Sequence, residues 1–155
     1  MKLDEEHPLN QLVLRNVKDK KGIRFDSRPI VSPDEHPDPY SEAGCHPDIV
    51  KRLWETLGSS LPADCRALVY GNPALVHPIL GIVIALGLGT GYAIRIPDEA
   101  MPESLEAGCE TKCEETGGGK VVIGEVLGKG WIFGCWKNAE KQWLTQMYSE
   151  LSKKG

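Results

Sequence analysis

The sequence predicts an α+β fold, in which an antiparallel, meander-like β-sheet at about residues 66–136 is packed by two amphipathic helices at residues 47–57 and 139–152. Three observations predict it. The chain has 155 residues, which is enough for one globular core. Short apolar segments bounded by glycine or proline lie between the two helices, and their connections are too short for parallel crossovers. We expect a single α+β domain at residues 41–155 and a peripheral N-terminal arm at residues 1–40.

The N-terminal arm is expected to hold a hairpin followed by a connector. The segments QLVL (residues 11–14) and IRF (residues 23–25) carry alternating apolar side chains on either side of the turn-like sequence KDKKG. The following SPDEHPDPYSEAG is rich in proline and acidic residues, which is typical of a connector. A lone hairpin is marginally stable in water, so we expect it to dock across the contact of a homodimer, with docking on its own domain as the alternative.

Two segments have the periodicity of amphipathic helices. In HPDIVKRLWETLGSSL the apolar residues fall on one face, Pro47 is acceptable in the first turn, and Gly58 can end the helix. The same spacing recurs in AEKQWLTQMYSEL, after Asn138, which can cap the helix N-terminus. Each helix therefore has one apolar face with which to cover the sheet.

Six short segments supply the expected strands: RALVYG, PALVHP, GIVIALG, YAIRIP, KVVIGEV and GWIFGCW. Turns are expected at Asn72-Pro73 and at residues 79–81, and such short connections require antiparallel neighbours. The stretch from Asp98 to Glu115 has seven acidic residues against one lysine and is expected to be an exposed acidic loop.

The run from Ala67 to Ile94 carries no charge if His77 is neutral, so a membrane span has to be weighed. Glycine and proline divide the run, and residues 79–94 fall short of the roughly 20 apolar residues that a spanning helix requires. We therefore expect short buried strands and no membrane association.

The segment VIALGLGTG, with Gly87, Gly89 and Gly91, resembles the first motif of the Rossmann-like S-adenosylmethionine-dependent methyltransferases. That resemblance implies a glycine loop that passes the cofactor and leads into a helix. Ala85 stands where the family usually has an acidic residue, and the following YAIRIP alternates like a strand and ends at Pro97. The sequence therefore favours a hairpin turn here, and a ligand loop is the alternative.

A few residues are candidates for ligand binding. His77 could be a general base or a strand-end histidine bonded to the backbone. Arg95 is expected on one surface of the sheet, where it could bind an anion or a partner's carboxylate, with a solvated arginine or an internal ion pair as the favoured alternatives. Trp131 and Trp136 flank IFGC and precede Glu140. Tryptophans at such places pack a core or, where exposed, mark an interface.

The five cysteines give little support for a metal site or a disulfide framework. Cys109 and Cys113 could in principle gather with Cys45 and His46 around zinc, but structural zinc sites more often show two close ligand pairs. The N-terminal sequence MKLDEEHPLN lacks the positive region of a secretory signal. We therefore expect a cytoplasmic protein with reduced thiols, no metal and no cofactor.

The leading functional hypothesis is a non-enzymatic interaction module, because no complete catalytic constellation is apparent. The net charge of −4 disfavours nucleic acid as a partner, and the six basic residues between Arg15 and Arg28 are expected in a solvated hairpin. The alternative is a small-ligand-binding protein or enzyme that uses the turn at residues 87–91 with His77 and Arg95.

Overall fold

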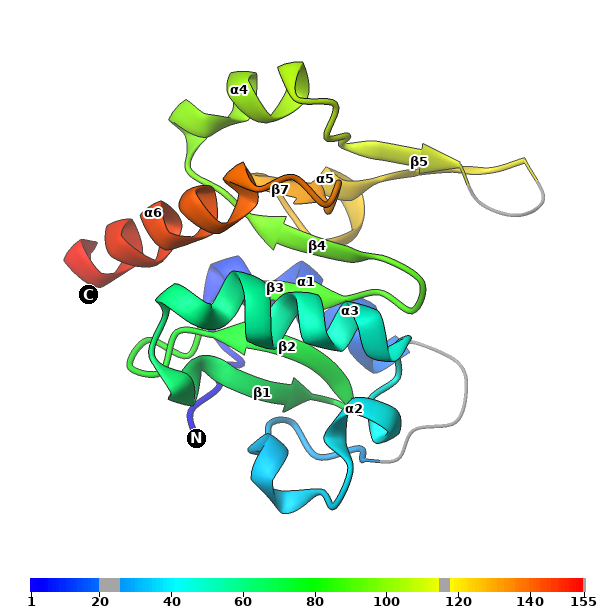
Figure 1. The fold of residues 1–155 in the computed structure, drawn as a ribbon, viewed down its shortest axis with the longest axis vertical. Helices are drawn as coiled ribbons and strands as arrows, with labels where there is room; N and C mark the ends of the chain where they lie inside the picture. Colours follow the sequence, from blue (N-terminus) through cyan, green and yellow to red (C-terminus); the bar gives the residue numbers. More distant parts are fainter. Residues whose placement is uncertain (20–25, 115–117, 155) are drawn as a thin grey trace.

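The computed structural model describes residues 1–19, 26–114 and 118–154 and has the predicted α+β fold. A five-stranded antiparallel sheet with the order β1-β2-β3-β4-β7 lies between two layers of helices (Figure 1). Its strands are β1 (Arg66–Val69), β2 (Asn72–Val76), β3 (Val83–Gly87), β4 (Tyr92–Arg95) and β7 (Trp131–Phe133). The first four strands form the expected meander, and β7 joins the sheet beside β4 after a long excursion of the chain.

The two predicted helices cover one face of the sheet. The first is α3 (Pro47–Lys51), which continues through a π-helical turn, η3 (Arg52–Thr56), and a tight turn, η4 (Leu57–Ser60). The second is α6 (Ala139–Lys154). Both present buried tryptophans to the sheet, and the indole N–H of Trp54 donates to the carbonyl of Ala74 on β2.

The opposite face is covered by α1 (Gln11–Asp19), which follows the short turn η1 (Pro8–Asn10), and by α5 (Ile123–Val126) (Figure 1). The prediction of a strand over QLVL is therefore wrong. Val13, Leu14 and Val17 are buried at helical spacing against the sheet. The IRF half of the expected hairpin lies outside the described residues.

Burial on both faces explains the uncharged run from residue 67 to residue 94. Every residue of β2, β3 and β4 is buried. Along β4, Tyr92 and Ile94 join the cluster beneath α3 and α6, whereas Ala93 joins the cluster beneath α1. A strand covered on both sides has no solvent-facing position that needs a charge. None of the helices in the described ranges has the length and apolar character that a membrane span needs.

The tightest connection of the sheet is the two-residue turn between β1 and β2. Tyr70 and Gly71 both have positive φ angles, 47° and 82°, as a type I′ hairpin requires. The predicted turn at Asn72-Pro73 is wrong, because both residues belong to β2 and pair with β1. The predicted turn at residues 79–81 lies between β2 and β3 as expected.

The excursion between β4 and β7 is more structured than the acidic loop that the sequence suggested. It holds η6 (Asp98–Ala100), α4 (Met101–Glu106) and a two-stranded ribbon of β5 (Lys112–Glu114) and β6 (Lys120–Val122). The prediction of one strand over KVVIGEV is wrong, because its second half is α5. The described part of the connector likewise contains η2 (Pro33–Glu35) and α2 (Pro39–Glu42), and η5 (Ala63–Cys65) precedes β1.

Asn10 fastens the N-terminal segment to the sheet. Its side chain is fully buried, and Nδ2 donates to the carbonyls of Asp4 and Gly81, both at 2.8 Å. Its Oδ1 accepts a hydrogen bond from the backbone N–H of Val83 at 3.0 Å. One side chain thus satisfies three backbone groups from two distant parts of the chain.

Substituting Asn10→Ala is expected to lower the free energy of unfolding by about 2–3 kcal/mol, because it leaves the buried N–H of Val83 without its acceptor and removes one of the hydrogen bonds to each of two carbonyls. Urea denaturation of the variant and the wild-type protein measures this loss. Arg15→Ala, at an exposed position of the following helix, is the control and should change stability by less than about 0.5 kcal/mol. Equal effects of the two substitutions would contradict the assigned role.

Candidate functional site

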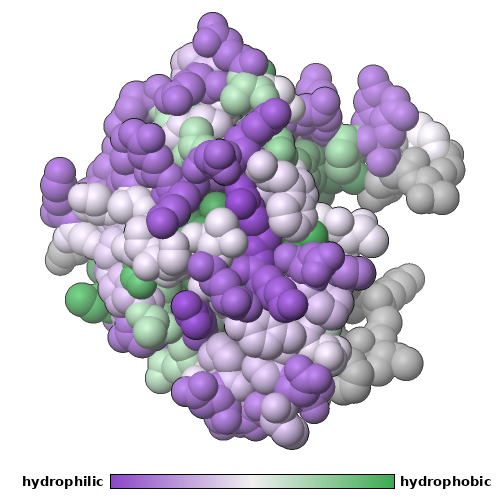
Figure 2. All heavy atoms as spheres, viewed as in Figure 1, coloured by the Kyte–Doolittle hydropathy of each residue, from purple (hydrophilic) through white to green (hydrophobic). Residues whose placement is uncertain are grey.

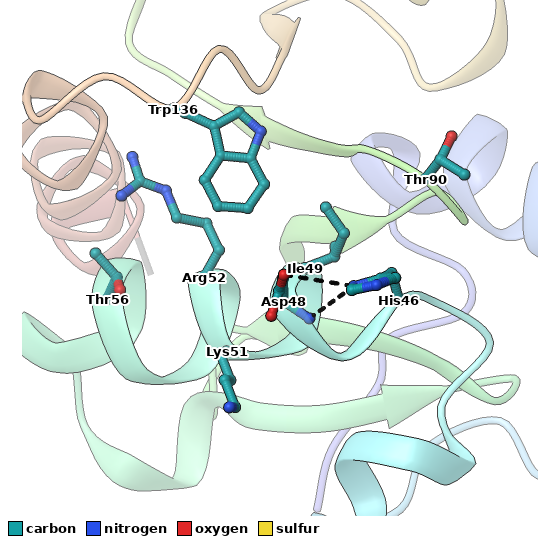
Figure 3. Close-up of a pocket in the computed structure, with 8 residues that line it drawn as sticks. All are labelled: His46, Asp48, Ile49, Lys51, Arg52, Thr56, Thr90 and Trp136. Carbon is teal, nitrogen blue, oxygen red and sulfur yellow. Dashed lines mark hydrogen bonds and ion pairs between the residues drawn. The ribbon is translucent and has the colours of Figure 1, made fainter.

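The main candidate site is a surface hollow of about 560 Å³ between the start of α3, the β3–β4 turn and the segment that joins β7 to α6 (Figure 3). We call it the Trp136 hollow. Its lining residues are His46, Asp48, Ile49, Lys51, Arg52, Thr56, Thr90 and Trp136. Hydrophilic side chains gather in the middle of the face that carries α3 (Figure 2).

Trp136 is the large aromatic side chain of this hollow, and its indole is 51% exposed. Its backbone has a φ of 59°, and its N–H donates to the hydroxyl of Tyr92 at 3.1 Å. The indole lies edge-on to the Tyr92 ring, with centroids 5.3 Å apart, and the guanidinium carbon of Arg52 lies 5.5 Å from the indole centroid. Because residues other than glycine rarely adopt such a φ, these contacts hold Trp136 in its unusual conformation.

A buried carboxylate lies beneath Trp136. Glu140 on α6 has no exposed surface, and its Oε1 accepts hydrogen bonds from Arg52 Nη2, at 2.6 Å, and from the hydroxyl of Tyr92. Its Oε2 accepts from the backbone N–H of Cys135 at 2.8 Å. Arg52 also donates to the carbonyl of Lys137 and to the Tyr92 hydroxyl. Glu140 therefore ties η3, β4 and α6 to the segment that carries Trp136.

The surroundings of Tyr92 and Arg52 determine the protonation states of these two side chains. Burial raises the pKa of Tyr92, and the neighbouring carboxylate of Glu140 raises it further. Burial opposes the charge of Arg52, but its hydrogen bonds to Glu140 and Tyr92 outweigh that effect and raise the pKa of the guanidinium. At neutral pH the Tyr92 O–H is thus a donor and Arg52 is a cation.

Gly134 lets the Tyr92 ring lie against the backbone of the same segment. Its N–H donates to the carbonyl of Tyr92 at 2.6 Å, and a Cβ at this position would overlap the Tyr92 ring. The N–H groups of Gly134, Cys135 and Trp136 therefore donate in succession to Tyr92, Glu140 and Tyr92 again. The consecutive donors make the segment a rigid support for the exposed indole.

A disulfide joins Cys135 to Cys109, with Cα atoms 5.2 Å apart. The prediction of reduced cysteines is therefore wrong for this pair, while Cys45, Cys65 and Cys113 form no disulfide in the described part of the chain. Among the described residues, Cys109, Cys135 and Glu140 form the group whose donor atoms lie close enough to hold a metal ion, all within 4.8 Å. This group differs from the zinc ligands that the sequence suggested, and its two sulfurs are bonded to each other in the structure.

The glycine segment forms the predicted hairpin turn. Gly87 pairs with Tyr92 across β3 and β4, and the N–H of Leu88 donates to the carbonyl of Gly91. Gly89 has a φ of 90°, which explains why glycine suits the turn. A strand follows the turn where a Rossmann-type loop needs a helix. Thr90, at the tip of this turn, reaches the Trp136 hollow.

His77 lies at the end of the β3–β4 hairpin opposite to the glycine turn and is buried. Its Nδ1 accepts from the N–H groups of Ile79 and Leu80, and Nε2 lies 2.8 Å from the hydroxyl of Ser152. The imidazole stacks on Tyr148, and burial lowers its pKa. These contacts are those of the strand-end histidine that the sequence offered as one alternative.

Arg95 is also buried at the end of the hairpin far from the glycine turn, but beneath α1. Its Nε donates to the carbonyl of Val83, its Nη2 donates to the carbonyl of Leu9, and its guanidinium lies 4.8 Å from the ring centroid of Trp131. Burial lowers its pKa to about 10. The sheet surface expected to expose this arginine is therefore covered, and Arg95 and Trp131 form a pair separate from that of Trp136 and Glu140.

A second concavity, of about 920 Å³, lies between α1, the β5–β6 ribbon and α5. Apolar residues such as Leu88 and Phe133 line it together with charged residues such as Arg15 and Glu125, and Cys113 pairs with Val121 across the ribbon. It meets the Trp136 hollow at Thr90. In the described part of the chain it gathers no set of converging polar groups of the kind that surrounds Glu140.

Sequence reasoning named Trp136 and Glu140 but missed Arg52, Tyr92 and Gly134. The sequence did contain one signal for Arg52, its position beside the apolar face of its helix. The long apolar stem of an arginine at such a position often packs over that face. Its partners lie 40 and 88 residues away. No family model, curated protein or solved structure matches this chain. The contacts within the chain therefore carry the functional argument.

Breaking the buried ion pair tests the network. Glu140→Gln is expected to lower the free energy of unfolding by about 3 kcal/mol, because it leaves the Arg52 guanidinium largely buried without its carboxylate. A double-mutant cycle with Arg52→Met, measured by urea denaturation, should give a coupling energy of about 2 kcal/mol. Glu106→Gln, on the exposed side of α4, is the control. A coupling energy near zero would contradict the assigned network.

The backbone of Trp136 gives a second test. Trp136→Gly is expected to be more stable than Trp136→Ala by about 1 kcal/mol, because only glycine adopts a positive φ without a steric cost. The same pair of substitutions at Lys137, whose φ is not positive, should give the ordinary order, with alanine the more stable. Thermal and urea denaturation measure both pairs. The ordinary order at both positions would rule out the constrained conformation.

Proposed function

We propose that this chain is a non-enzymatic interaction module that binds an acidic segment of a partner protein in the Trp136 hollow. The observation that carries the proposal is Trp136 itself, a half-exposed indole held by Tyr92 and Arg52 in a backbone conformation that tryptophan rarely adopts. Tryptophan, tyrosine and arginine are the residues that most often dominate protein interfaces.

Preorganisation supports this role. A flexible side chain loses conformational entropy when a partner immobilises it, and that loss weakens binding. The Trp136 indole is already held in the unbound chain by one backbone hydrogen bond and two ring contacts. A partner that packs against it therefore gains apolar contact at a small entropic cost.

The charges around the hollow favour an acidic partner. Lys51 and Lys137 are exposed, and His46 and Asp48 lie together at the start of α3 with Nδ1 and Oδ2 3.8 Å apart (Figure 3). The charge of Arg52 is compensated by Glu140. Against the one carboxylate of Asp48, the two lysines leave a local excess of one positive charge on a chain whose net charge is −4.

The use of the buried polar groups supports binding in preference to catalysis. Both oxygens of Glu140, the Tyr92 hydroxyl and Arg52 Nη2 are engaged within the chain. Thr56 and Thr90 offer hydroxyl groups to the hollow, and in the described part of the chain neither is hydrogen-bonded to a base. A network engaged in this way positions a surface, whereas a catalytic group needs a position open to substrate.

Homodimerisation and a cytoplasmic location remain predictions, and so does the absence of nucleic-acid binding. The N-terminal segment gives less reason to expect a dimer, because α1 packs on its own sheet. Light scattering on the full chain tests whether it forms a dimer. A chain that begins at Ser41 does not serve as the comparison, because it lacks α1, which covers one face of the sheet.

Selection from a displayed library of short random peptides tests the proposed binding. We expect enrichment of peptides in which Asp or Glu flanks an aromatic or leucine residue, with affinities that fall as salt is added. Trp136→Ala should weaken the selected peptides about thirtyfold, which is the size of a hot-spot effect.

Two matched variants control the experiment. Leu105→Ala removes a similarly exposed apolar side chain, 48% exposed, on α4 and should leave affinity unchanged. Lys129→Glu, outside the hollow, should have a much smaller effect than Lys51→Glu. Enriched peptides that bind Trp136→Ala as tightly as the wild-type protein would refute the proposed site.

A further inference from the structure

We propose that the Cys109–Cys135 disulfide is a redox-active regulatory site, and that its reduction by a dithiol loosens Trp136 and weakens binding in the Trp136 hollow. The inference rests on the proposed function, since it names the regulation of the same surface. The inference follows from the position of the disulfide, because Cys135 is the neighbour in sequence of Trp136, the residue proposed to contact the partner.

The disulfide connects an anchored sulfur to the segment that supports Trp136. Cys109 follows α4, is 2% exposed, and donates its backbone N–H to the carbonyl of Ser104 at 3.0 Å. Cys135 is half-buried and immediately precedes Trp136. The sulfur–sulfur bond is therefore a covalent tether between the α4 region and the base of the exposed indole.

Opening the bond disturbs the same hydrogen bonds that hold Trp136. Two thiol sulfurs must separate to van der Waals contact, which moves Cys135 relative to Cys109. The N–H of Cys135 donates to Glu140, and the next N–H along the chain, that of Trp136, donates to Tyr92. A shift of Cys135 is therefore passed directly to both bonds.

Reduction of the disulfide also affects Trp136 through the buried carboxylate of Glu140. The donor atoms of Cys109, Cys135 and Glu140 all lie within 4.8 Å of one another. In the disulfide the sulfurs carry no hydrogen, whereas each thiol is a donor close to the carboxylate. The new S–H groups compete for the oxygens that receive hydrogen bonds from Arg52 and Tyr92, the two side chains that flank the Trp136 indole.

The exchange reaction is balanced by an external dithiol. One thiolate of the dithiol attacks the sulfur of Cys135, the more exposed of the pair, and expels the sulfur of Cys109, which takes up a proton. The second thiolate of the reagent then attacks the mixed disulfide and releases Cys135, which also takes up a proton. The protein disulfide gains two electrons and two protons, and the dithiol becomes a disulfide.

One further observation agrees with a regulatory role. Cys65 is poorly placed to exchange with the pair, because it is buried and its burial raises the pKa of its thiol to about 12.

The test compares the full wild-type chain with itself in oxidised and reduced dithiothreitol, with a metal chelator present. Differential alkylation and peptide mapping report the redox state of each cysteine, and amide hydrogen exchange reports on Cys135 and Trp136. On reduction we expect both amides to exchange at least about tenfold faster, and the selected acidic peptide to bind about tenfold more weakly, within the usual range of coupling between sites.

Two variants sharpen the comparison. Cys109→Ser with Cys135→Ser should exchange and bind like the reduced wild-type protein and should not respond to dithiothreitol. Cys113→Ser, which leaves the disulfide intact, should respond like the wild-type protein. Because the wild-type chain is compared with itself, the test does not depend on the folding of either variant.

The outcomes separate this inference from the proposed function. Unchanged exchange at Cys135 and Trp136 after complete reduction overturns the regulation, whether or not peptides bind. Peptide binding that depends on Trp136 and is equal in both redox states overturns the regulation and keeps the proposed function. Faster exchange without any binding that depends on Trp136 supports the structural coupling and overturns the proposed function.

Discussion

The structure depends on covering both faces of one small sheet. Strands β2, β3 and β4 have no exposed residue, so the sheet is stable in water only while α3 and α6 cover one face and α1 covers the other. Covering the sheet also buries backbone polar groups. Asn10 forms hydrogen bonds with two of them where the N-terminal segment meets the sheet. The site follows from the same packing, since the covering helices bring Arg52 and Glu140 to β4.

Much of the scaffold could be predicted from local patterns. The helices that begin at Pro47 and Ala139 have apolar spacing, the first also has a capping side chain in His46, and the β3–β4 turn has a glycine at the position with positive φ. Residues 11–14 were misread because four mostly apolar residues fit a strand as well as a helix. The deciding fact, an uncovered face of the sheet, is a property of the tertiary structure.

The candidate site was only half predictable for a related reason. Trp136 and Glu140 stand out in the sequence as an aromatic and an acidic residue near the start of a helix. Arg52 and Tyr92 do not, because their role comes from hydrogen bonds that join distant segments. The disulfide was missed because no spacing rule relates Cys109 to Cys135, which are 26 positions apart in the sequence. Chemistry that depends on long-range pairing leaves little trace in local sequence.

The long separations within the site also bear on how the protein folds. Arg52 meets Tyr92, Lys137 and Glu140 across 40, 85 and 88 residues, and each contact requires the strands between them to be in place. Closing such loops is slow compared with forming single helices. A partly folded chain can therefore hold most of its helices and still lack an ordered Trp136. A partner that recognises this surface would therefore bind completely folded molecules and leave partly folded ones unbound.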